Sequence, residues 1–415
     1  MIQLYKLLKE GLFMKCIFKK LIAVIAVIAV LLNAAVLSFA ADDSTTAQAV
    51  RFNNDGKLRI MHVTDTHLSE DNLDDSVWLI SVACDREKPD LIMLTGDIAM
   101  ADTAEEIHRR IDRLMNVFEE RSIPVAVTFG NHDSENGVCT REELMAYYNT
   151  FDCSISVDDG ELLPWCGTYN IPVLGSKDDE MKFNLWVFDS GDYDSEHHYS
   201  CVSAEQVKWY TEKSEQIEKE NGKKINSIAF QHIIVDDVYE ALKQVKIKGA
   251  YTYPHIYDSK KYYQFNPDME NFGMLHEKPC SGYANYGQFS AMVERGDVLA
   301  IFSGHDHTND FGVKYKGIDI VNSLSTRYNG DAFSTQYGYR IIEIDENNTD
   351  TYTTKAVRWF DFFKQSDMKQ LRKSGDEHIK LAREIRFIGF FKKLFMNLGI
   401  FFVQMFTGRT VRYKY

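Results

Sequence analysis

The chain has 415 residues, of which 45% are hydrophobic and 26% are charged, and its formal net charge is −14. This length and apolar content are consistent with one large domain that buries a substantial core. The acidic balance argues against a face that binds nucleic acid through its phosphates, because such a face is basic.

The first 40 residues have the pattern of a secretory signal peptide. Three lysines ending at Lys20 precede a mostly apolar stretch from Leu21 to Leu37, and small residues lead up to Ala40. We predict cleavage after Ala40, which leaves residues 41–54 as a linker. An uncleaved segment would instead be a marginal membrane anchor. The segment holds five Lys and one Glu, so its removal takes the net charge from −14 to −18. We expect an exported protein, extracellular or in the cell envelope.

Five short apolar runs, rich in β-branched residues, predict buried strands, and amphipathic stretches between them predict helices. Strands that alternate with helices indicate βαβ units, an α/β fold and a largely parallel sheet. The strands are expected at Leu58–Thr64, Leu91–Thr95, Val125–Phe129, Ile228–Phe230 and Val298–Ser303, and the helices at Val77–Glu87, Thr103–Glu120, Arg141–Asn149, Ser203–Lys219 and Tyr286–Arg295.

A polar cluster follows each of the five predicted strands. In a parallel sheet ligands bind beyond the carboxyl ends of the strands, so these clusters are expected to converge on one rim. The clusters are Asp65-Thr66-His67, Gly96-Asp97, Gly130-Asn131-His132-Asp133, Gln231-His232 and Gly304-His305-Asp306-His307.

The clusters offer carboxylates, imidazoles and one amide oxygen, and no thiolate. That set suits two divalent ions such as Mn, Fe or Zn. Two cations roughly 3.5–4 Å apart need a bridging anion, for which a carboxylate is the natural group. Such a pair polarises a phosphoryl oxygen and lowers the pKa of a bound water, while a nearby His supplies a proton to the leaving alkoxide. The pattern therefore predicts a hydrolase with two metal ions.

From about Lys57 to Leu324 the five clusters resemble the calcineurin-like metallophosphoesterase superfamily. The resemblance implies a four-layer α/β/β/α sandwich of two mixed sheets flanked by helices, spanning residues 55–384. It also implies a role for each site residue. Asp65, His67 and His307 would bind one metal, Asn131, His232 and His305 the other, Asp97 would bridge them, His132 would donate a proton and contact phosphate, and Asp133 would orient the His132 ring.

The segment Cys280-Ser281-Gly282-Tyr283 and the residues after His307 are similar to the branch that holds the Dcr2-type phosphatases and small plant purple-acid-phosphatase-like proteins. True purple acid phosphatases place an iron-binding Tyr three residues after the bridging Asp, where this chain has Met100. We therefore expect a divalent pair and no tyrosinate–iron centre.

The resemblance predicts an exported enzyme that acts on a phosphoester substrate. It would hydrolyse a phosphate monoester or diester by in-line attack of a metal-bridging hydroxide, with no covalent intermediate. The alternative is a non-catalytic surface binding or scaffold protein that retains the fold.

The C-terminal segment, residues 385–415, has six Lys or Arg, no acidic residue, and apolar side chains such as Phe387, Phe391 and Leu394 at helical spacing. This pattern predicts a basic amphipathic helix that either lies in a membrane surface or docks on a protein surface. Before it, Tyr339–Ile344 and Thr351–Trp359 are expected to pair antiparallel and complete a second sheet.

The sequence supports less specific predictions for residues outside the clusters. Six cysteines remain once Cys16 leaves with the signal, and Cys139, Cys153 and Cys166 either form a local disulfide or are free buried thiols. His62 lies on a predicted strand and is expected in the core.

Overall fold

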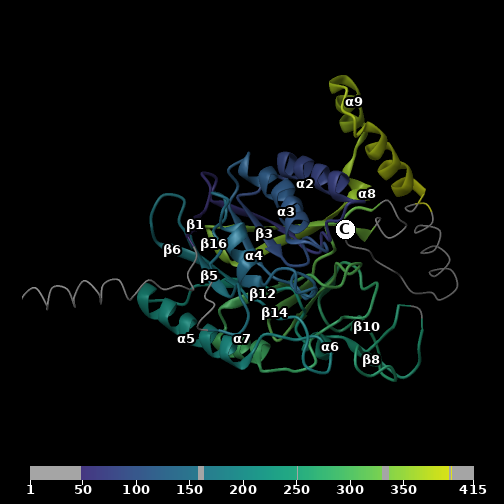
Figure 1. Cartoon of the computed structure of the whole chain (residues 1–415). Coiled ribbons are helices and arrows are strands. Elements are labelled where there is room, and N and C mark those ends of the chain that lie inside the picture. Colours follow the sequence, from purple (N-terminus) through teal and green to yellow (C-terminus); the bar gives the residue numbers. More distant parts are fainter. Residues whose placement is uncertain (1–47, 158–162, 250, 330–335, 392–393, 395–415) are drawn as a thin grey trace, which may run out of the picture. The chain divides into compact units, whose positions relative to one another are not determined.

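The described chain contains two large β-sheets (Figure 1), and the polar clusters follow the ends of five of their strands. The computed structural model describes residues 48–157, 163–249, 251–329, 336–391 and 394. The predicted signal peptide and most of the predicted C-terminal helix lie outside these residues.

The first sheet has five strands in the order β16-β15-β2-β3-β4. Its parallel part is β2 (Lys57–Val63), β3 (Leu91–Thr95) and β4 (Val125–Thr128), as the apolar runs predicted. The predicted C-terminal pair is β15 (Gly338–Asp345) and β16 (Asn348–Arg358), and it is antiparallel. However, β15 pairs with the open edge of β2, so the pair extends this sheet and does not complete a second one.

The second sheet has eight strands and is mixed, not largely parallel. Parallel strands at its centre include the predicted β7 (Ser227–Phe230) and β12 (Val298–Ser303). Antiparallel pairs flank them on both sides. The order is β1-β5-β6-β7-β12-β14-β13-β11, in which the remaining strands are β1 (Val50–Arg51), β5 (Tyr169–Leu174), β6 (Met181–Val187), β11 (Asn271–Phe272), β13 (Gly312–Tyr315) and β14 (Ile318–Asn322).

The sheet begins inside the predicted linker 41–54, because β1 pairs parallel with β5. Val50 and Phe52 are buried in the core, so these apolar residues have a packing role that a linker does not have. The linker prediction is therefore wrong from Val50 onward.

The two sheets pack face to face and helices cover their outer faces (Figure 1). Along β2, Leu58 and Ile60 pack toward the second sheet while Met61 and Val63 pack toward the helices, as the two-residue period of a strand requires. This confirms the α/β/β/α sandwich of mixed sheets. The helices α2 (Leu73–Glu87), α3 (Ala104–Glu119) and α4 (Arg141–Tyr148) cover the first sheet, and α5 (Ala204–Asn221) and α7 (Gln288–Arg295) cover the second.

Side-chain caps explain where three of the helices begin. The hydroxyl of Thr103 accepts a hydrogen bond from the backbone N–H of Glu106 at the start of α3. Thr140 starts α4 and Ser203 starts α5, each with a reciprocal capping box that satisfies two backbone donors. The predicted helices are confirmed, although α2 starts at Leu73, four residues before the expected Val77.

Smaller elements complete the described part of the chain, in which no helix is long and apolar enough to cross a bilayer. No disulfide joins the six described cysteines, and Cys139, Cys153 and Cys166 are buried, so the described residues do not contain the predicted local disulfide. These elements are a three-stranded sheet of β8 (Lys243–Val245), β10 (Tyr262–Gln264) and β9 (Tyr253–Pro254), the helices α6 (Val238–Ala241), α8 (Trp359–Phe362) and α9 (Gln365–Ser374), and helical residues 379–391.

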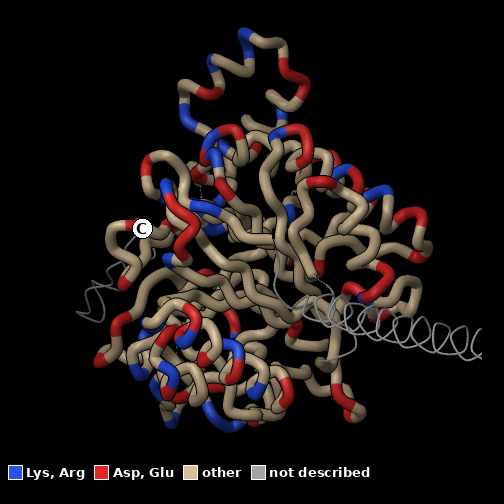
Figure 2. Tube along the Cα trace, turned by 90° about the vertical axis from the view of Figure 1, so that its left-hand side faces the viewer, with Lys and Arg blue, Asp and Glu red and all other residues tan. Residues whose placement is uncertain are grey.

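Charged residues of both signs are interspersed along the described trace (Figure 2). Cross-strand pairs between β2 and β15 are one example, with Lys57 Nζ 2.7 Å from Asp345 and Arg59 2.7 Å from Glu343. Exposed pairs of this kind contribute little to the free energy of unfolding, because water and salt screen their charges. They therefore help to fix strand register more than they determine stability.

Candidate dinuclear metal site

The predicted ligands meet where the ends of β2, β3 and β4 approach the ends of β7 and β12. Atoms that can bind a metal lie within 4.8 Å of one another in each of two groups. Asn131 joins the second group, because its Oδ1 lies 3.2 Å from His232 Nε2. The first group is Asp65, His67 and His307, and the second is Asp97, His232 and His305.

Asp97 faces both groups through one oxygen. Its Oδ2 lies 3.2 Å from His232 Nε2 and 3.7 Å from His67 Nε2. Asp65 Oδ1 lies 3.5 Å from His307 Nε2 and 3.9 Å from His232 Nε2. The position of Asp97 between the groups is the one that a bridging carboxylate requires.

Three buried atoms of the site have no hydrogen-bond partner among the described residues. They are Asp65 Oδ1, Asp97 Oδ2 and His305 Nε2. Buried polar atoms are normally satisfied, and a buried carboxylate needs a compensating charge. Two divalent cations bound by this donor set of carboxylates, imidazoles and an amide would satisfy all three atoms, so the residues present fit the predicted metals.

The two carboxylates dominate the electrostatics of the protein groups. Burial lowers the pKa of His232, but Asp97 and Asp65 outweigh it and raise that pKa to about 10. Burial raises the pKa of Asp65, whereas His232 and the neighbouring histidines hold it well below its usual range. The site therefore keeps its carboxylates ionised, and a metal that binds His232 must displace a proton.

The backbone at the site adopts conformations that are uncommon for side-chain-bearing residues. Four predicted ligands have positive φ: Asp65 (52°), His67 (40°), Asp97 (54°) and His305 (70°). Such residues persist where surrounding contacts determine the conformation, and they concentrate at functional sites. Gly130 lets the backbone pass close to Asp97 and His232. A Cβ at this position would lie 2.8 Å from His232 and closer still to Asp97 Oδ1.

Hydrogen bonds behind the ligands fix their orientation. His232 Nδ1 donates to the carbonyl of Thr95 at 2.7 Å, which leaves Nε2 to face the site. Asp65 Oδ2 accepts from the backbone N–H of His305 at 2.9 Å. Asn131 Nδ2 donates to the Tyr193 hydroxyl at 2.8 Å, which turns Oδ1 toward His232. Tyr193 was not predicted, since it lies in the segment after β6, far from the five clusters in sequence.

The role predicted for Asp133 is wrong. Its carboxylate is buried and accepts backbone N–H groups of Asp97 (2.8 Å), Ile98 (3.0 Å) and Gly130 (2.7 Å), so it joins the loop after β3 to the loop after β4. Burial and the Asp97 charge raise the pKa of Asp133, while the three amides oppose them. The ring of His132 instead has Glu135 as its partner, with His132 Nδ1 2.5 Å from Glu135 Oε2.

His132 itself lies beside the two groups, as predicted. Its backbone N–H donates to Asp97 Oδ1 at 2.8 Å, and its ring centroid is 5.7 Å from that of His67. Its side chain is 30% exposed, so a substrate can reach it.

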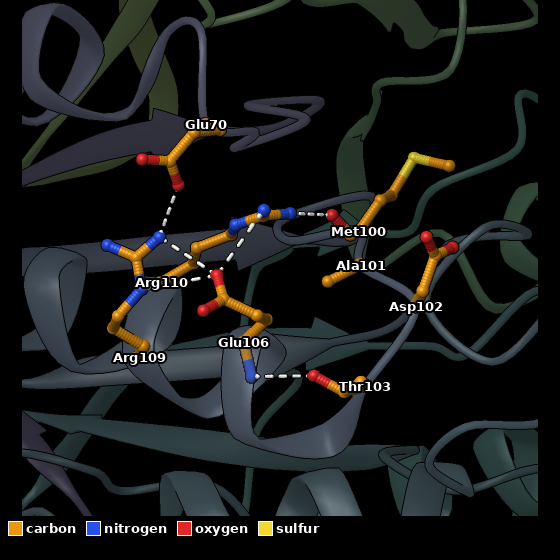
Figure 3. Close-up of a pocket in the computed structure, with 8 residues that line it drawn as sticks. All are labelled: Glu70, Met100, Ala101, Asp102, Thr103, Glu106, Arg109 and Arg110. Carbon is orange, nitrogen blue, oxygen red and sulfur yellow. Dashed lines mark hydrogen bonds and ion pairs between the residues drawn. The ribbon is translucent and has the colours of Figure 1, made fainter.

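Met100 occupies the position three residues after Asp97 and lies against a ligand. Its Sδ is 3.2 Å from Nδ1 of His67, so a thioether stands behind that ring. Met100 also borders a cavity of about 700 Å³ (Figure 3). The cavity is lined by Glu70, Met100, Ala101, Asp102, Thr103, Glu106, Arg109 and Arg110.

The arginines of this cavity already have partners. Arg109 contacts Glu70 at 2.5 Å and Glu106 at 2.9 Å. Arg110 is buried and donates to the carbonyl of Met100, which holds the loop after Asp97 in place (Figure 3). Their charges therefore stabilise the loop.

Aromatic side chains form a further boundary of the site that the sequence did not indicate. Tyr199 stands edge-on to His305 with ring centroids 4.3 Å apart, and it stacks on Tyr193. Beyond it, His198 stacks on the exposed ring of Tyr283 at 4.0 Å. These residues belong to the segments after β6 and before α7, so side chains distant in sequence border the second group of ligands.

Comparison with known families and proteins agrees with this geometry. The model of the calcineurin-like phosphoesterase family matches residues 58–309. Two proteins of Arabidopsis thaliana are similar: probable inactive purple acid phosphatase 14, 28% identical over 68% of this chain and 73% of its own length, and probable inactive purple acid phosphatase 29, 25% identical over 78% and 85%. Phosphatase DCR2 of Saccharomyces cerevisiae is 24% identical over 75% of this chain and 56% of its own. Among solved structures, a dimetal phosphatase from Danio rerio aligns over 69% of this chain and 92% of its own with a TM-score of 0.44 and 13% identity.

Proposed function

This chain belongs to the calcineurin-like phosphoesterase family, and from that premise we propose that it is an exported hydrolase that uses two divalent metal ions to cleave a phosphate monoester or diester. The observation that carries the proposal is the meeting of two ligand groups at Asp97, with unpartnered buried atoms on Asp65, Asp97 and His305. All seven predicted ligands come together, six of them in the two groups and Asn131 beside the second.

The residues of the chain have separate roles in the proposed reaction. When bound, the two cations supply charge to polarise the phosphoryl oxygens and a water of lowered pKa. The seven ligands hold that charge at one point, and Asp97 belongs to both halves of the site. His132, adjacent to Asp97 and exposed on one side, donates a proton to the leaving oxygen. Water attacks phosphorus in line with the leaving group, with no covalent intermediate.

The proposal is tested by phosphate and nitrophenol release from mono- and bis-nitrophenyl phosphate. The purified full chain is assayed with Mn²⁺, with Zn²⁺ and after chelation. Turnover that depends on added metal supports the proposal, and the ratio of the two rates separates monoesterase from diesterase. No metal-dependent turnover on either ester would contradict it.

A second candidate is a binding or scaffold protein that retains the fold without turnover. The names of two relatives, which call them probable inactive purple acid phosphatases, favour it. Elemental analysis after exposure to Mn²⁺ separates the candidates when combined with the assay. Bound metal without turnover supports the scaffold, whereas bound metal with turnover supports the enzyme.

Export and membrane association form the remaining part of the proposal. The segments that suggest them, residues 1–40 and most of 385–415, lie outside the described residues. In the part of the tail that is described, Ile385 is buried against the core while Phe387 (65% exposed), Phe390 and Phe391 face outward. An exposed aromatic face beside cations supports contact with anionic lipid. Co-sedimentation of the full chain with anionic liposomes, compared with Phe387→Ser/Phe391→Ser, tests this, and equal binding of both would contradict it.

A further inference from the structure

The loop after β4 contains a carboxylate, Glu135, that lies outside all five clusters. Its Oε2 is 2.5 Å from Nδ1 of His132, and the two side chains are 38% and 30% exposed. Glu135 is therefore near enough to hold the ring but is not a buried ligand of the metals.

A hydrogen bond at Nδ1 selects which nitrogen of His132 faces the substrate. If Nδ1–H donates to Glu135, the ring plane is fixed and Nε2 is the free nitrogen. The backbone N–H of His132 is held separately by Asp97 Oδ1. The residue is thus fixed at two points, one on the main chain and one on the ring, and only the ring contact depends on Glu135.

Asp133 cannot serve in place of Glu135. Both of its oxygens accept backbone N–H groups, from Asp97 and Gly130 on one oxygen and from Ile98 on the other. Its carboxylate is occupied in joining two loops, which leaves the ring of His132 to Glu135.

Glu135 also interacts with the side chain that holds Asn131. The hydroxyl of Tyr193 accepts from Asn131 Nδ2 at 2.8 Å. Burial raises the pKa of Tyr193, and the nearby charge of Glu135 raises it further. Tyr193 is itself fixed, because it pairs with Tyr199 through a β-bridge and stacks on its ring. The Glu135 carboxylate therefore contacts the proposed proton donor and lies near the side chain that supports a proposed ligand.

We infer that Glu135 is a positioning residue, which orients the His132 ring toward the leaving group. This inference rests on the proposed function, because it assigns a role to His132 in ester cleavage. A positioning residue acts through the group that it orients. Its removal should therefore lower the rate most for esters whose leaving group must be protonated.

Leaving-group dependence tests the inference. The full chain, Glu135→Ala, Glu135→Gln and the control Glu142→Ala are assayed with Mn²⁺ on an alkyl phosphate and on 4-nitrophenyl phosphate. Glu142 is an exposed carboxylate on the first turn of α4, so its removal matches the charge change. We expect Glu135→Ala to lower kcat on the alkyl ester about 10–10²-fold, the usual cost of losing an orienting partner, with little change on the nitrophenyl ester. Glu135→Gln keeps an acceptor and should recover at least half of that loss.

An equal loss on both esters, or no recovery in Glu135→Gln, would overturn the positioning role. Metal content serves as the structural check, since loss of bound Mn²⁺ in Glu135→Ala would show that Glu135 supports the ligand Asn131 and not His132, and would also overturn it.

A measurement without turnover keeps this inference separate from the proposed function. In the metal-free full chain, the Nδ1–H of His132 should give a downfield proton resonance that disappears in both His132→Ala and Glu135→Ala and persists in Glu142→Ala. If the wild-type protein hydrolyses no ester, the proposed function fails. This resonance then still shows whether Glu135 holds the His132 ring. Its persistence in Glu135→Ala would overturn the inference.

Discussion

His62 makes the stability of this fold depend on pH. It lies on β2 beneath the site, fully buried, with Nδ1 2.9 Å from the Ser323 hydroxyl and Nε2 2.7 Å from the Thr95 hydroxyl. Burial and the charge of Arg340 lower the pKa of His62 from 6.5 to about 3. The folded protein therefore holds this ring neutral at pH values where the unfolded chain protonates it.

The sign and size of the effect follow from these two pKa values. Above pH 6.5 both states are neutral and His62 contributes no pH dependence. Below it the unfolded chain binds one more proton, so the free energy of unfolding falls by about 1.4 kcal/mol per pH unit until the pH nears the folded pKa. Between pH 8 and 4.5 the loss is about 3 kcal/mol, which is a large part of the stability of a typical domain.

The assay is urea unfolding of the full chain and of His62→Gln, both in the presence of a chelator, at pH values from 8 to 4.5. Gln keeps polar groups near both hydroxyls but has no proton to bind. The other titrating groups, including His305, are present in both proteins. Their contributions therefore cancel when the unfolding free energy of one protein is subtracted from that of the other. We expect the difference in unfolding free energy between the two proteins to narrow as the pH falls. Parallel pH profiles would contradict the lowered pKa of His62 in the folded protein.

Three further predictions concern the site. Asp97→Asn should lower both bound Mn²⁺ and turnover, because a neutral amide replaces the oxygen that faces both groups; retention of two ions per chain would contradict the bridging role. His132→Ala should keep the metals and slow alkyl ester cleavage roughly 10²–10⁴-fold, and loss of both metals would show that it is a ligand and not a proton donor. Gly130→Ala should abolish metal binding, because its Cβ would overlap Asp97 and His232, and Gly249→Ala, where a Cβ meets only Thr252, is the control; normal metal content in Gly130→Ala would contradict the geometry.

The parallel strands and the convergence of the polar clusters could be predicted because each depends on local sequence. Leu91–Thr95 and Val298–Ser303 are apolar runs whose length and composition alone indicate buried strands. A residue directly after such a strand must lie at the carboxyl edge of the sheet, which places Asp97 and His305 without further information. The family assignment read from these clusters is confirmed by the match to residues 58–309.

The hydrogen bonds behind the ligands could not be predicted, because they depend on which acceptors are free after folding. Asp133 and Glu135 are both near His132 in sequence, and only the approach of the loop after β3 shows that Asp133 is occupied by backbone amides. Tyr193 reaches Asn131 from a segment about 60 residues away, and nothing in its local sequence marks it. The edge of β2 that receives β15 is likewise a property of the assembled sheet.

The proposed function requires that the seven ligands bind two divalent ions that drive phosphoester hydrolysis. Its most direct test is a titration of the metal-free full chain with Mn²⁺ in which phosphate release from nitrophenyl phosphate and bound metal are measured on the same samples. The rate should rise with bound metal and reach a plateau at about two ions per chain. Phosphate release that does not depend on bound metal, or no release at two bound ions, would contradict it.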